Sequence, residues 1–260
     1  MPNIIVCYKW VMDEQDIYIN AETLALETSR AKYKISDYDR NAIEEGMRII
    51  EKHGGSLKTL TYGLPQVKSS LKGALSRGPE AGFWIGDESA AHADAYVTAN
   101  VLAAAIRKIG EYDIIICGEG SSDVYSQQVG PRLAALLGIT PVSFVESFEI
   151  LDDKMIARRN LGHCIEVIEV QGPLMMSVLP DINSPRLATV KQLMAAGKKP
   201  TTEFKIAELD LAIEKLQPKN KVEKIKGAVF DRKNIMLREE TMIANVTRLV
   251  EYMDKEGVLL

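Results

Sequence analysis

HADAYVTANVLAAAIRKIGEYDIIICG, from His92 to Gly118, is the stretch of this 260-residue sequence that decides the fold. In its first part Val97, Val101 and Ala105 recur at steps of four, which predicts the apolar face of a helix that ends at Gly110. Its second part, YDIIICG, is a continuous apolar run, which is typical of a strand buried on both faces of a parallel sheet. A helix that leads into a buried strand is a building unit of α/β sheets.

The same alternation runs through the residues that precede this stretch. We predict strands at 3–9, 56–63 and 80–86, and helices at 39–55 and 64–78. This order predicts a doubly wound, mainly parallel α/β sheet of the Rossmann-like, adenine-nucleotide-binding type.

The pattern changes after Pro141. Strands are predicted at 142–150, 154–160, 164–170 and 174–180, and the second and third of these form an added β-hairpin. The segment after Pro200 is more polar and contains a single amphipathic helix, which cannot form a core alone. We therefore predict a nucleotide-binding domain over 1–200 and a C-terminal arm over 201–260.

Composition narrows the class of protein. A net charge of −4 provides no basic field for nucleic acid, and no apolar run reaches the length of a membrane-spanning helix. The N-terminus shows no signal-peptide pattern, so a cytoplasmic location is expected. The three cysteines have no CxxC spacing and are expected to be buried thiols, and the three histidines are scattered, so no metal site is predicted.

The loop CGEGSSDVYSQQVG, from Cys117 to Gly130, follows the strand within the opening stretch. In open α/β sheets ligands bind beyond the carboxyl ends of the strands where the strand order reverses. Gly118 and Gly120 allow close backbone approach, and the helix after the loop offers free N–H groups to an anion. A lysine of the P-loop type is absent, so phosphate would be held by amides and hydroxyls. Alternatively, Asp123 only caps the helix and the glycines only form a turn.

A second loop, DINSPR from Asp181 to Arg186, is stiffened by prolines on both sides of an exposed-looking Ile182. An apolar side chain on a preorganised loop is typical of an interface anchor. The alternative is an ordinary connector with Ile182 packed into its own core. Thr189 is well placed to cap a short helix over 190–196.

Four stretches together resemble the β subunit of electron-transfer flavoproteins. They are NIIVCYKWVMDEQ, SRGPE, GEGSSDVYSQQVGPRLAALLG and DINSPRLATVKQLMAAGKKP. The resemblance covers residues 1 to about 200 and is weaker over the arm. The forms DVYSQQVG and DINSPR are most similar to the anaerobic branch, the Fix-type proteins and those associated with acyl-CoA reductases, which includes electron-bifurcating members.

This resemblance implies a heterodimer with an α subunit that carries an electron-transferring FAD. In bifurcating members the β subunit holds a second FAD, which accepts hydride from NADH. Electrons then pass to the α-subunit FAD, an acyl-CoA dehydrogenase or reductase, and ferredoxin or flavodoxin. In other members the β subunit holds AMP. The flavin supplies the redox chemistry, so no side chain is expected to act as a catalytic group.

The resemblance also assigns site residues. The nucleotide contacts fall on the ends of two strands, the segment before the first long helix and the glycine-rich loop: Cys7, Lys9, Ser36, Asp37, Tyr38, Asp39, Tyr62, Gly63, Gly118, Gly120, Ser121, Asp123, Ser126, Gln127, Gln128, Val129 and Gly130. The loop that recognises the dehydrogenase falls on Asp181, Ile182, Asn183, Pro185, Arg186 and Leu187. Ile182 matches an anchor that is often leucine.

Two other classes share parts of this pattern. A stand-alone nucleotide-binding protein of the universal-stress type also has glycines at the spacing of Gly120 and Gly130, but it needs neither the DINSPR loop nor the arm. An adenylate-forming ligase of related fold is disfavoured because a basic pyrophosphate loop is missing.

Overall fold

The computed structural model describes residues 1–151, 154–228 and 232–259. The chain divides into two compact units. The first unit consists of 1–18 and 27–225, and the second of 19–26 and 226–260.

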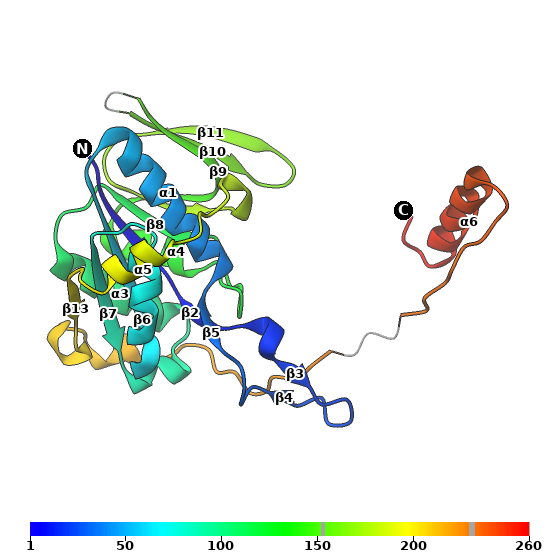
Figure 1. Ribbon diagram of the computed structural model, residues 1–260, viewed down its shortest axis with the longest axis horizontal. Helices are drawn as coiled ribbons and strands as arrows, with labels where there is room; N and C mark the ends of the chain where they lie inside the picture. The colour runs from blue at the N-terminus through cyan, green and yellow to red at the C-terminus, as the bar shows by residue number, and fades with distance from the viewer. Residues whose placement is uncertain (152–153, 229–231, 260) are drawn as a thin grey trace. The chain divides into compact units, whose positions relative to one another are not determined.

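A nine-stranded sheet forms the centre of the first unit, in the order β11-β10-β9-β12-β8-β1-β6-β7-β13 (Figure 1). Its strands, in chain order, are β1 (Asn3–Cys7), β6 (Ser56–Gly63), β7 (Ala81–Gly86), β8 (Ile114–Gly118), β9 (Thr140–Leu151), β10 (Lys154–Asn160), β11 (Ile165–Val170), β12 (Leu174–Val178) and β13 (Thr201–Glu203). The pairs β9–β10 and β10–β11 are antiparallel, and the other pairs are parallel. The predicted mainly parallel α/β sheet with an added hairpin is confirmed.

The helices are α1 (Asp37–His53), α2 (Leu71–Leu75), α3 (Ala95–Ile109), α4 (Val129–Leu137), α5 (Val190–Ala196) and α6 (Met242–Lys255). Asp94 caps α3. Thr189 caps α5, as predicted from the sequence. The predicted helix over 64–78 is instead a 3₁₀ segment, Pro65–Ser70, followed by the short α2. Within it the Ser70 hydroxyl donates to the carbonyl of Val67 at 2.6 Å, one of the local contacts by which serine competes with regular helical bonding.

The strand order reverses between β1 and β8. From β1 the chain proceeds to β6 and then β7 on one side, and after α3 it returns to β8 on the other side of β1. Such a reversal is the topological switch point at which open α/β sheets bind ligands. The carboxyl ends at this point are Cys7 and Gly118.

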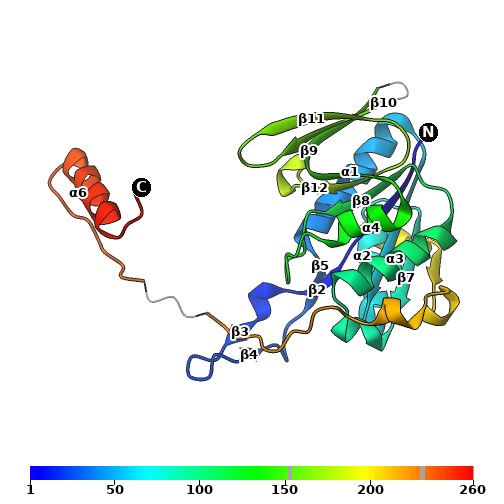
Figure 2. The same ribbon diagram turned by 180° about the vertical axis from the view of Figure 1, so that it is seen from behind.

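Alternating residues of the central strands pack on opposite faces of the sheet. Ile5 and Cys7 belong to the core that includes α3 and α4, whereas Ile4 and Val6 belong to the core that includes α1. Figure 1 shows α1 on one side of the sheet, and Figure 2 shows α3 and α4 from the other side. Both faces of β1 and β8 are therefore covered, which explains their unbroken apolar sequences.

Residues 10–35, which show no clear period in sequence, contain four short strands. They are β2 (Trp10–Met12), β3 (Tyr18–Ile19), β4 (Leu26–Glu27) and β5 (Tyr33–Ile35). β2 and β5 pair as an antiparallel ribbon, and the Trp10 and Tyr33 rings lie 4.7 Å apart on it.

The first unit continues past the expected boundary at residue 200. Strand β13 adds to the sheet edge beside β7, and Phe204 and Leu209 are buried in the core that includes α3. Burial of these two side chains explains why 201–225 belongs to this unit. Cys7 and Cys117 are buried as expected, but Cys164 is exposed because it lies in the turn between β10 and β11.

The second unit contains α6, which begins after the cap residue Thr241. Several apolar side chains of this helix are exposed: Met242, Ile243, Val246, Leu249 and Val250. They recur at helical spacing, so α6 presents one apolar face. Within the described ranges, none of the helices combines the length and the hydrophobicity required to cross a bilayer.

Candidate functional site

The residues assigned to the nucleotide gather at the switch point, beyond the ends of β1, β6 and β8. Cys7 ends β1, Gly63 ends β6 and Gly118 ends β8. The first turn of α1 and the loop 119–128 complete this edge of the sheet. All of these segments belong to the first unit.

The first turn of α1 is bonded to both strand ends through Asp39. One carboxylate oxygen of Asp39 accepts the N–H of Lys9 at 2.8 Å, and the other accepts the N–H of Gly118 at 3.0 Å. Asp39 is only 5% exposed, and burial raises its pKa to about 7 despite these bonds. A Cβ on Gly118 would lie 2.7 Å from the Cβ of Tyr38, so only glycine lets the helix approach this closely.

The loop 119–128 is tied to β1 and α1 by polar contacts. The Lys9 ammonium lies 2.6 Å from the Asp123 carboxylate. Burial acts to raise the pKa of Asp123, but the Lys9 charge and hydrogen bonds hold it below its usual value. The backbone N–H of Ser122 donates to the Ser36 hydroxyl at 3.3 Å, and the N–H of Asp37 donates to the Ser122 hydroxyl at 3.1 Å.

The middle of the loop is shaped by Glu119 and Tyr125. The Tyr125 hydroxyl donates to the buried Glu119 carboxylate at 2.7 Å, which raises the pKa of Tyr125 to about 12. Tyr125 has a φ of 49° and Gln127 a φ of 56°, a conformation that is uncommon for residues with a side chain. A Cβ on Gly120 would lie 2.5 Å from the Tyr125 ring, so a larger residue here would force this ring to move. The Tyr38 and Tyr125 rings lie 5.2 Å apart.

Helix α4 begins directly after this loop. The side chain of the N-cap residue Gln128 makes no capping bond to a backbone N–H of α4; its oxygen instead accepts from the Arg132 guanidinium at 2.9 and 3.2 Å. The first backbone N–H groups of α4 are therefore suited to hold an anion. Pro131 lies in the first turn, as expected, where its missing N–H costs no helical bond. Gly130 packs against β12, where a Cβ would lie 3.1 Å from the sulfur of Met175.

Other assigned residues lie at this edge but face inward. Cys7 is buried, and contact with its thiol, together with burial, raises the pKa of Cys117. The Tyr62 hydroxyl lies 3.0 Å from that of Ser89, and burial raises the pKa of Tyr62. The Cys7, Cys117 and Tyr62 side chains are all buried in the core that includes α3 and α4.

A pocket of about 320 Å³ opens beside the first turn of α1. It is lined by Glu14, Asp37, Tyr38, Asn41, Ser122 and Pro180. Two of the residues assigned to the nucleotide, Asp37 and Tyr38, line it. The pocket also reaches Pro180, so it adjoins the second candidate loop.

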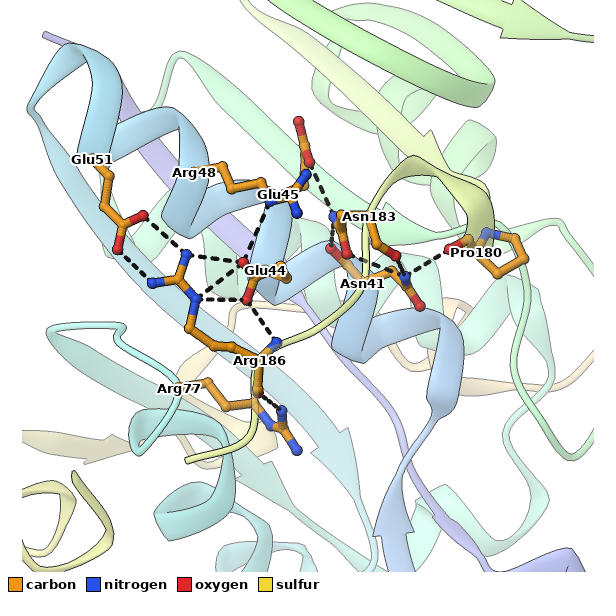
Figure 3. Close-up of polar contacts among 9 residues, drawn as sticks. All are labelled: Asn41, Glu44, Glu45, Arg48, Glu51, Arg77, Pro180, Asn183 and Arg186. Carbon is orange, nitrogen blue, oxygen red and sulfur yellow. Dashed lines mark hydrogen bonds and ion pairs between the residues drawn. The ribbon is translucent and has the colours of Figure 1, made fainter. Parts of the chain in front are cut away.

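The loop after β12 is fixed to α1 by a dense polar network (Figure 3). The Arg186 guanidinium bonds Glu44 at 2.9–3.0 Å and Glu51 at 2.7–2.9 Å, so it bridges two carboxylates of α1. Its backbone N–H also donates to Glu44 at 3.2 Å, and its carbonyl accepts from Arg77 at 3.0 Å. Two carboxylates keep the pKa of Arg186 above its usual value.

A pair of asparagines fixes the other end of this loop. The Asn41 amide donates to the carbonyls of Pro180 and Asn183, both at 2.8 Å. The Asn183 amide returns a bond to the carbonyl of Asn41 at 3.0 Å and another to Glu45 at 3.0 Å. Burial raises the pKa of Glu45. The loop is therefore preorganised, as its prolines predict.

The two apolar side chains of this loop, Ile182 and Leu187, lie in different environments. Ile182 is half-buried and packs against the core on the α1 side, whereas Leu187 is 83% exposed. Val190 and Met194 of α5 are also exposed. Of the two interpretations of Ile182 from sequence, the structure supports the one in which this side chain packs into the protein's own core, because the loop folds back onto α1.

Several residues of the site are not among those assigned from sequence. Ser122, Tyr125 and Glu119 shape the glycine-rich loop, and they lie within a stretch that the sequence already indicated. Asn41 and Glu44 hold the loop after β12 in place. In the sequence of α1, however, nothing distinguishes them from ordinary polar residues on the surface of a helix. Among the described residues no group of three His, Cys, Asp or Glu could hold a metal ion.

The sheet and its switch point define a doubly wound α/β protein with a Rossmann-like fold. Comparison with known sequences identifies its family. Residues 23–209 match the electron transfer flavoprotein domain. The chain is 35% identical over 213 residues to the electron transfer flavoprotein subunit beta of Thermoanaerobacterium thermosaccharolyticum, a similarity that covers 82% of this chain and 81% of that protein. The chain belongs to the electron transfer flavoprotein family.

Proposed function

We propose that this chain is the β subunit of a heterodimeric electron-transfer flavoprotein and that its switch-point site binds an adenine nucleotide. The observation that carries the proposal is the first turn of α4, which follows the loop 119–128 and has no side-chain cap from Gln128. Backbone N–H groups at a helix start favour a phosphate group. The family match supports the same reading.

The charges of the site suit one or two phosphates and argue against a triphosphate. The Lys9 ammonium is paired with Asp123, and the Glu119 carboxylate accepts from Tyr125. Phosphate would be bound by the N–H groups of Ser126 to Val129 and by hydroxyls such as Ser121. The residues present therefore fit the phosphate of AMP or the pyrophosphate of FAD.

We favour FAD in this site, with NADH as the electron donor, on the resemblance of DVYSQQVG and DINSPR to the bifurcating branch. If FAD is bound, the N–H groups of Ser126 to Val129 would hold its pyrophosphate and the flavin would supply the hydride and electron-transfer chemistry, while the protein would supply binding, orientation and electrostatics. The onward acceptors are the α-subunit FAD, an acyl-CoA dehydrogenase or reductase, and ferredoxin or flavodoxin. The alternative is a β subunit that holds AMP as a structural nucleotide.

The number of flavins in the complex distinguishes these alternatives. We expect the chain purified with its α subunit to contain two FAD per heterodimer and to reduce ferredoxin with NADH. One FAD plus AMP would contradict bifurcation and would leave the β-subunit assignment intact. A complex without any nucleotide in this chain would contradict the site itself.

Two substitutions test the loop directly. Asp123→Ala removes the partner of Lys9, and Gly130→Leu forces side-chain atoms against Met175. Both are expected to weaken nucleotide binding, and Glu149→Ala on β9 serves as a control remote in sequence. Full nucleotide occupancy in both loop variants would show that the loop is not the binding element.

We propose that the C-terminal segment packs on the α subunit. The exposed apolar face of α6 requires a partner surface to be buried. The deletion should begin after Ile225, since a cut after Pro200 would also remove β13 and the buried Phe204. We expect the shortened chain to stay folded and to lose heterodimer assembly on a sizing column, and an unchanged heterodimer would contradict this role.

The loop from Asp181 to Leu187 is proposed to recognise the dehydrogenase. Its fixed geometry lowers the entropy that docking would cost, and Leu187 provides an exposed apolar contact. We expect Leu187→Ser to weaken binding of the dehydrogenase without changing the nucleotide content. Unchanged affinity in this variant and in Ile182→Ala would place the docking site elsewhere.

A further inference from the structure

We propose that Asp39 is a positioning residue whose carboxylate bridges the ends of β1 and β8 and so sets the opening in which the nucleotide binds. This inference rests on the proposed function of the switch-point site. It assigns Asp39 to the wall of the site, in place of a direct contact with the ligand.

The two strands separate where this bridge lies. Their ladder pairs Ile4 with Ile114 and extends to Val6 with Ile116, and beyond it the chains diverge toward the two loops of the site. The N–H groups of Lys9 and Gly118 lie just past the ladder, and Asp39 accepts both, at 2.8 and 3.0 Å. One side chain thus replaces the missing ladder bonds at the point where the sheet opens.

The position of α1 fixes this carboxylate. The missing Cβ of Gly118 leaves the space that Tyr38 and Asp39 occupy, since a Cβ would lie 2.8 Å from an Asp39 oxygen. The backbone of Asp39 is itself bonded to the carbonyl of Ser36 at 3.0 Å. Helix α1 therefore fixes the position of the carboxylate, and the carboxylate in turn positions the ends of β1 and β8 through its hydrogen bonds.

The orientation of Lys9 depends on the same bridge. Its backbone N–H is bonded to Asp39, while its ammonium reaches Asp123 on the loop 119–128 at 2.6 Å. A change at Asp39 would therefore move the residue that connects β1 to that loop. This is a mechanism by which a buried side chain without ligand contact alters nucleotide affinity.

The opposite end of the strand pair provides a natural comparison. There the Asp113 carboxylate, which precedes β8, accepts the N–H of Asn3 at the start of β1 at 2.7 Å. Both aspartates link the same strands through backbone N–H groups. Asp113 is exposed and lies at the edge away from the loops, whereas Asp39 is buried at the edge that forms the site.

The bridge is sensitive to protonation. The groups whose charges interact with Asp39 include the Lys9 ammonium, the Asp123 carboxylate on the loop, the Tyr8 hydroxyl just after β1 and the Cys117 thiol on β8. Burial raises the pKa of Asp39 to about 7, so a proton is gained near neutral pH. A protonated carboxyl has an O–H donor and accepts N–H groups less well, so the bridge weakens as the pH falls.

The test is the affinity of the full-length chain for AMP as a function of pH, for the wild type and for Asp39→Asn. The substitution keeps the shape but turns an NH₂ group toward one of the two backbone N–H groups. Because a phosphate group itself titrates near pH 6, the quantity followed is the ratio of the variant and wild-type dissociation constants. We expect a ratio of about ten or more at pH 8, since each lost charged hydrogen bond is worth roughly a factor of ten.

The ratio should fall toward one at pH 5.5, where the wild-type Asp39 is itself protonated. Asp113→Asn is the control and should bind AMP as the wild type does at every pH. A constant ratio would assign Asp39 a general structural role and would overturn the proposal, as would a ratio near one throughout. A wild-type chain that binds neither AMP nor FAD at any pH would overturn the proposed function as well.

A second measurement decides the matter if Asp39→Asn does not fold. In the wild type the amide proton shifts of Lys9 and Gly118 should titrate together near pH 7 by NMR, while that of Asn3 should not. Absence of a shared transition at these two amides would overturn the bridge.

Discussion

The loops that follow β8 and β12 leave neighbouring parallel strands at the same edge of the sheet, and both contact α1, yet they are held in different ways. The loop 119–128 depends on hydroxyl contacts, on residues with positive φ and on the partly exposed pair of Lys9 and Asp123. The loop 180–187 is bonded to α1 by a guanidinium that spans two carboxylates and by a pair of asparagines.

This difference matches the two proposed tasks. A loop that binds a nucleotide must leave some backbone N–H groups for the ligand, and the first turn of α4, directly after the loop 119–128, has no side-chain cap from Gln128. A loop that docks a protein partner gains from a single fixed shape, because less entropy is lost on association. Helix α1 supports both loops, the first through its N-terminal turn and the second through its middle and end. Four predictions test the contrast.

The largest effect is expected from the charge of Asp39. Its pKa is near 7 in the folded chain and near 4 in the unfolded chain, so the folded state binds the proton more tightly. The stability contributed by this proton is fully present below about pH 4 and is lost as the pH rises through 7. Relative to Asp39→Asn, wild-type stability should fall by up to about 1.4 kcal/mol per pH unit in this window. The free energy of unfolding of both proteins is measured by urea denaturation at several pH values. If it changes with pH in the same way in both, this prediction is wrong.

The second loop should be the more sensitive to loss of one charge. Arg186→Ala leaves Glu44, which is 5% exposed, without its main partner. We expect a loss of about 2–3 kcal/mol, below the value for a fully buried pair because Arg186 is 40% exposed. Lys9→Ala, which removes the partner of Asp123 in the first loop, should cost less than about 1 kcal/mol, as is usual for exposed pairs. The free energy of unfolding of both variants is measured by urea denaturation. If Arg186→Ala and Lys9→Ala lose the same amount, the proposed contrast between the two loops is wrong.

A methyl group on Gly120 should disturb the first loop alone. It would force the Tyr125 ring to move and break its bond to Glu119, at a cost of about 1–2 kcal/mol with weaker AMP binding. Gly73→Ala in α2 is the matched control, because the nearest atom to its Cβ would be 3.8 Å away, and it should be neutral or slightly stabilising. Calorimetric titration with AMP and thermal denaturation measure both effects.

The smallest effect on stability is expected at the surface of the second loop. Leu187→Ser should change the free energy of unfolding by less than about 0.5 kcal/mol, since this side chain is 83% exposed. Ile182→Ala, at a half-buried position against the core, should cost about 1 kcal/mol. If Leu187→Ser proves the more destabilising of the two, Leu187 and not Ile182 is the side chain that packs against the core.

Much of the fold follows from local patterns. The apolar runs of β1, β6, β7, β8 and β12 and the period of α3 identify these elements because a buried strand or an amphipathic helix imposes its own spacing. Strand β13 was not predicted: its sequence, Thr-Thr-Glu, has no apolar pattern, and backbone bonds to β7 alone place it in the sheet. The ribbon of β2 and β5 was also not predicted, because each of its strands has only three residues, which is too short for an alternating pattern.

The candidate site divides in the same way. Local patterns predict a glycine-rich, lysine-free loop after one buried strand, a proline-stiffened loop after another, and a cap at Thr189 for α5. Each of these depends on neighbours in the chain. Local patterns could not predict that Asp39 is a buried bridge between β1 and β8, that Arg186 reaches Glu44 across 142 residues, or that Leu187 faces solvent while Ile182 packs inward. These properties arise from contacts between distant segments, and burial and pairing of a side chain are set by what the fold places around it.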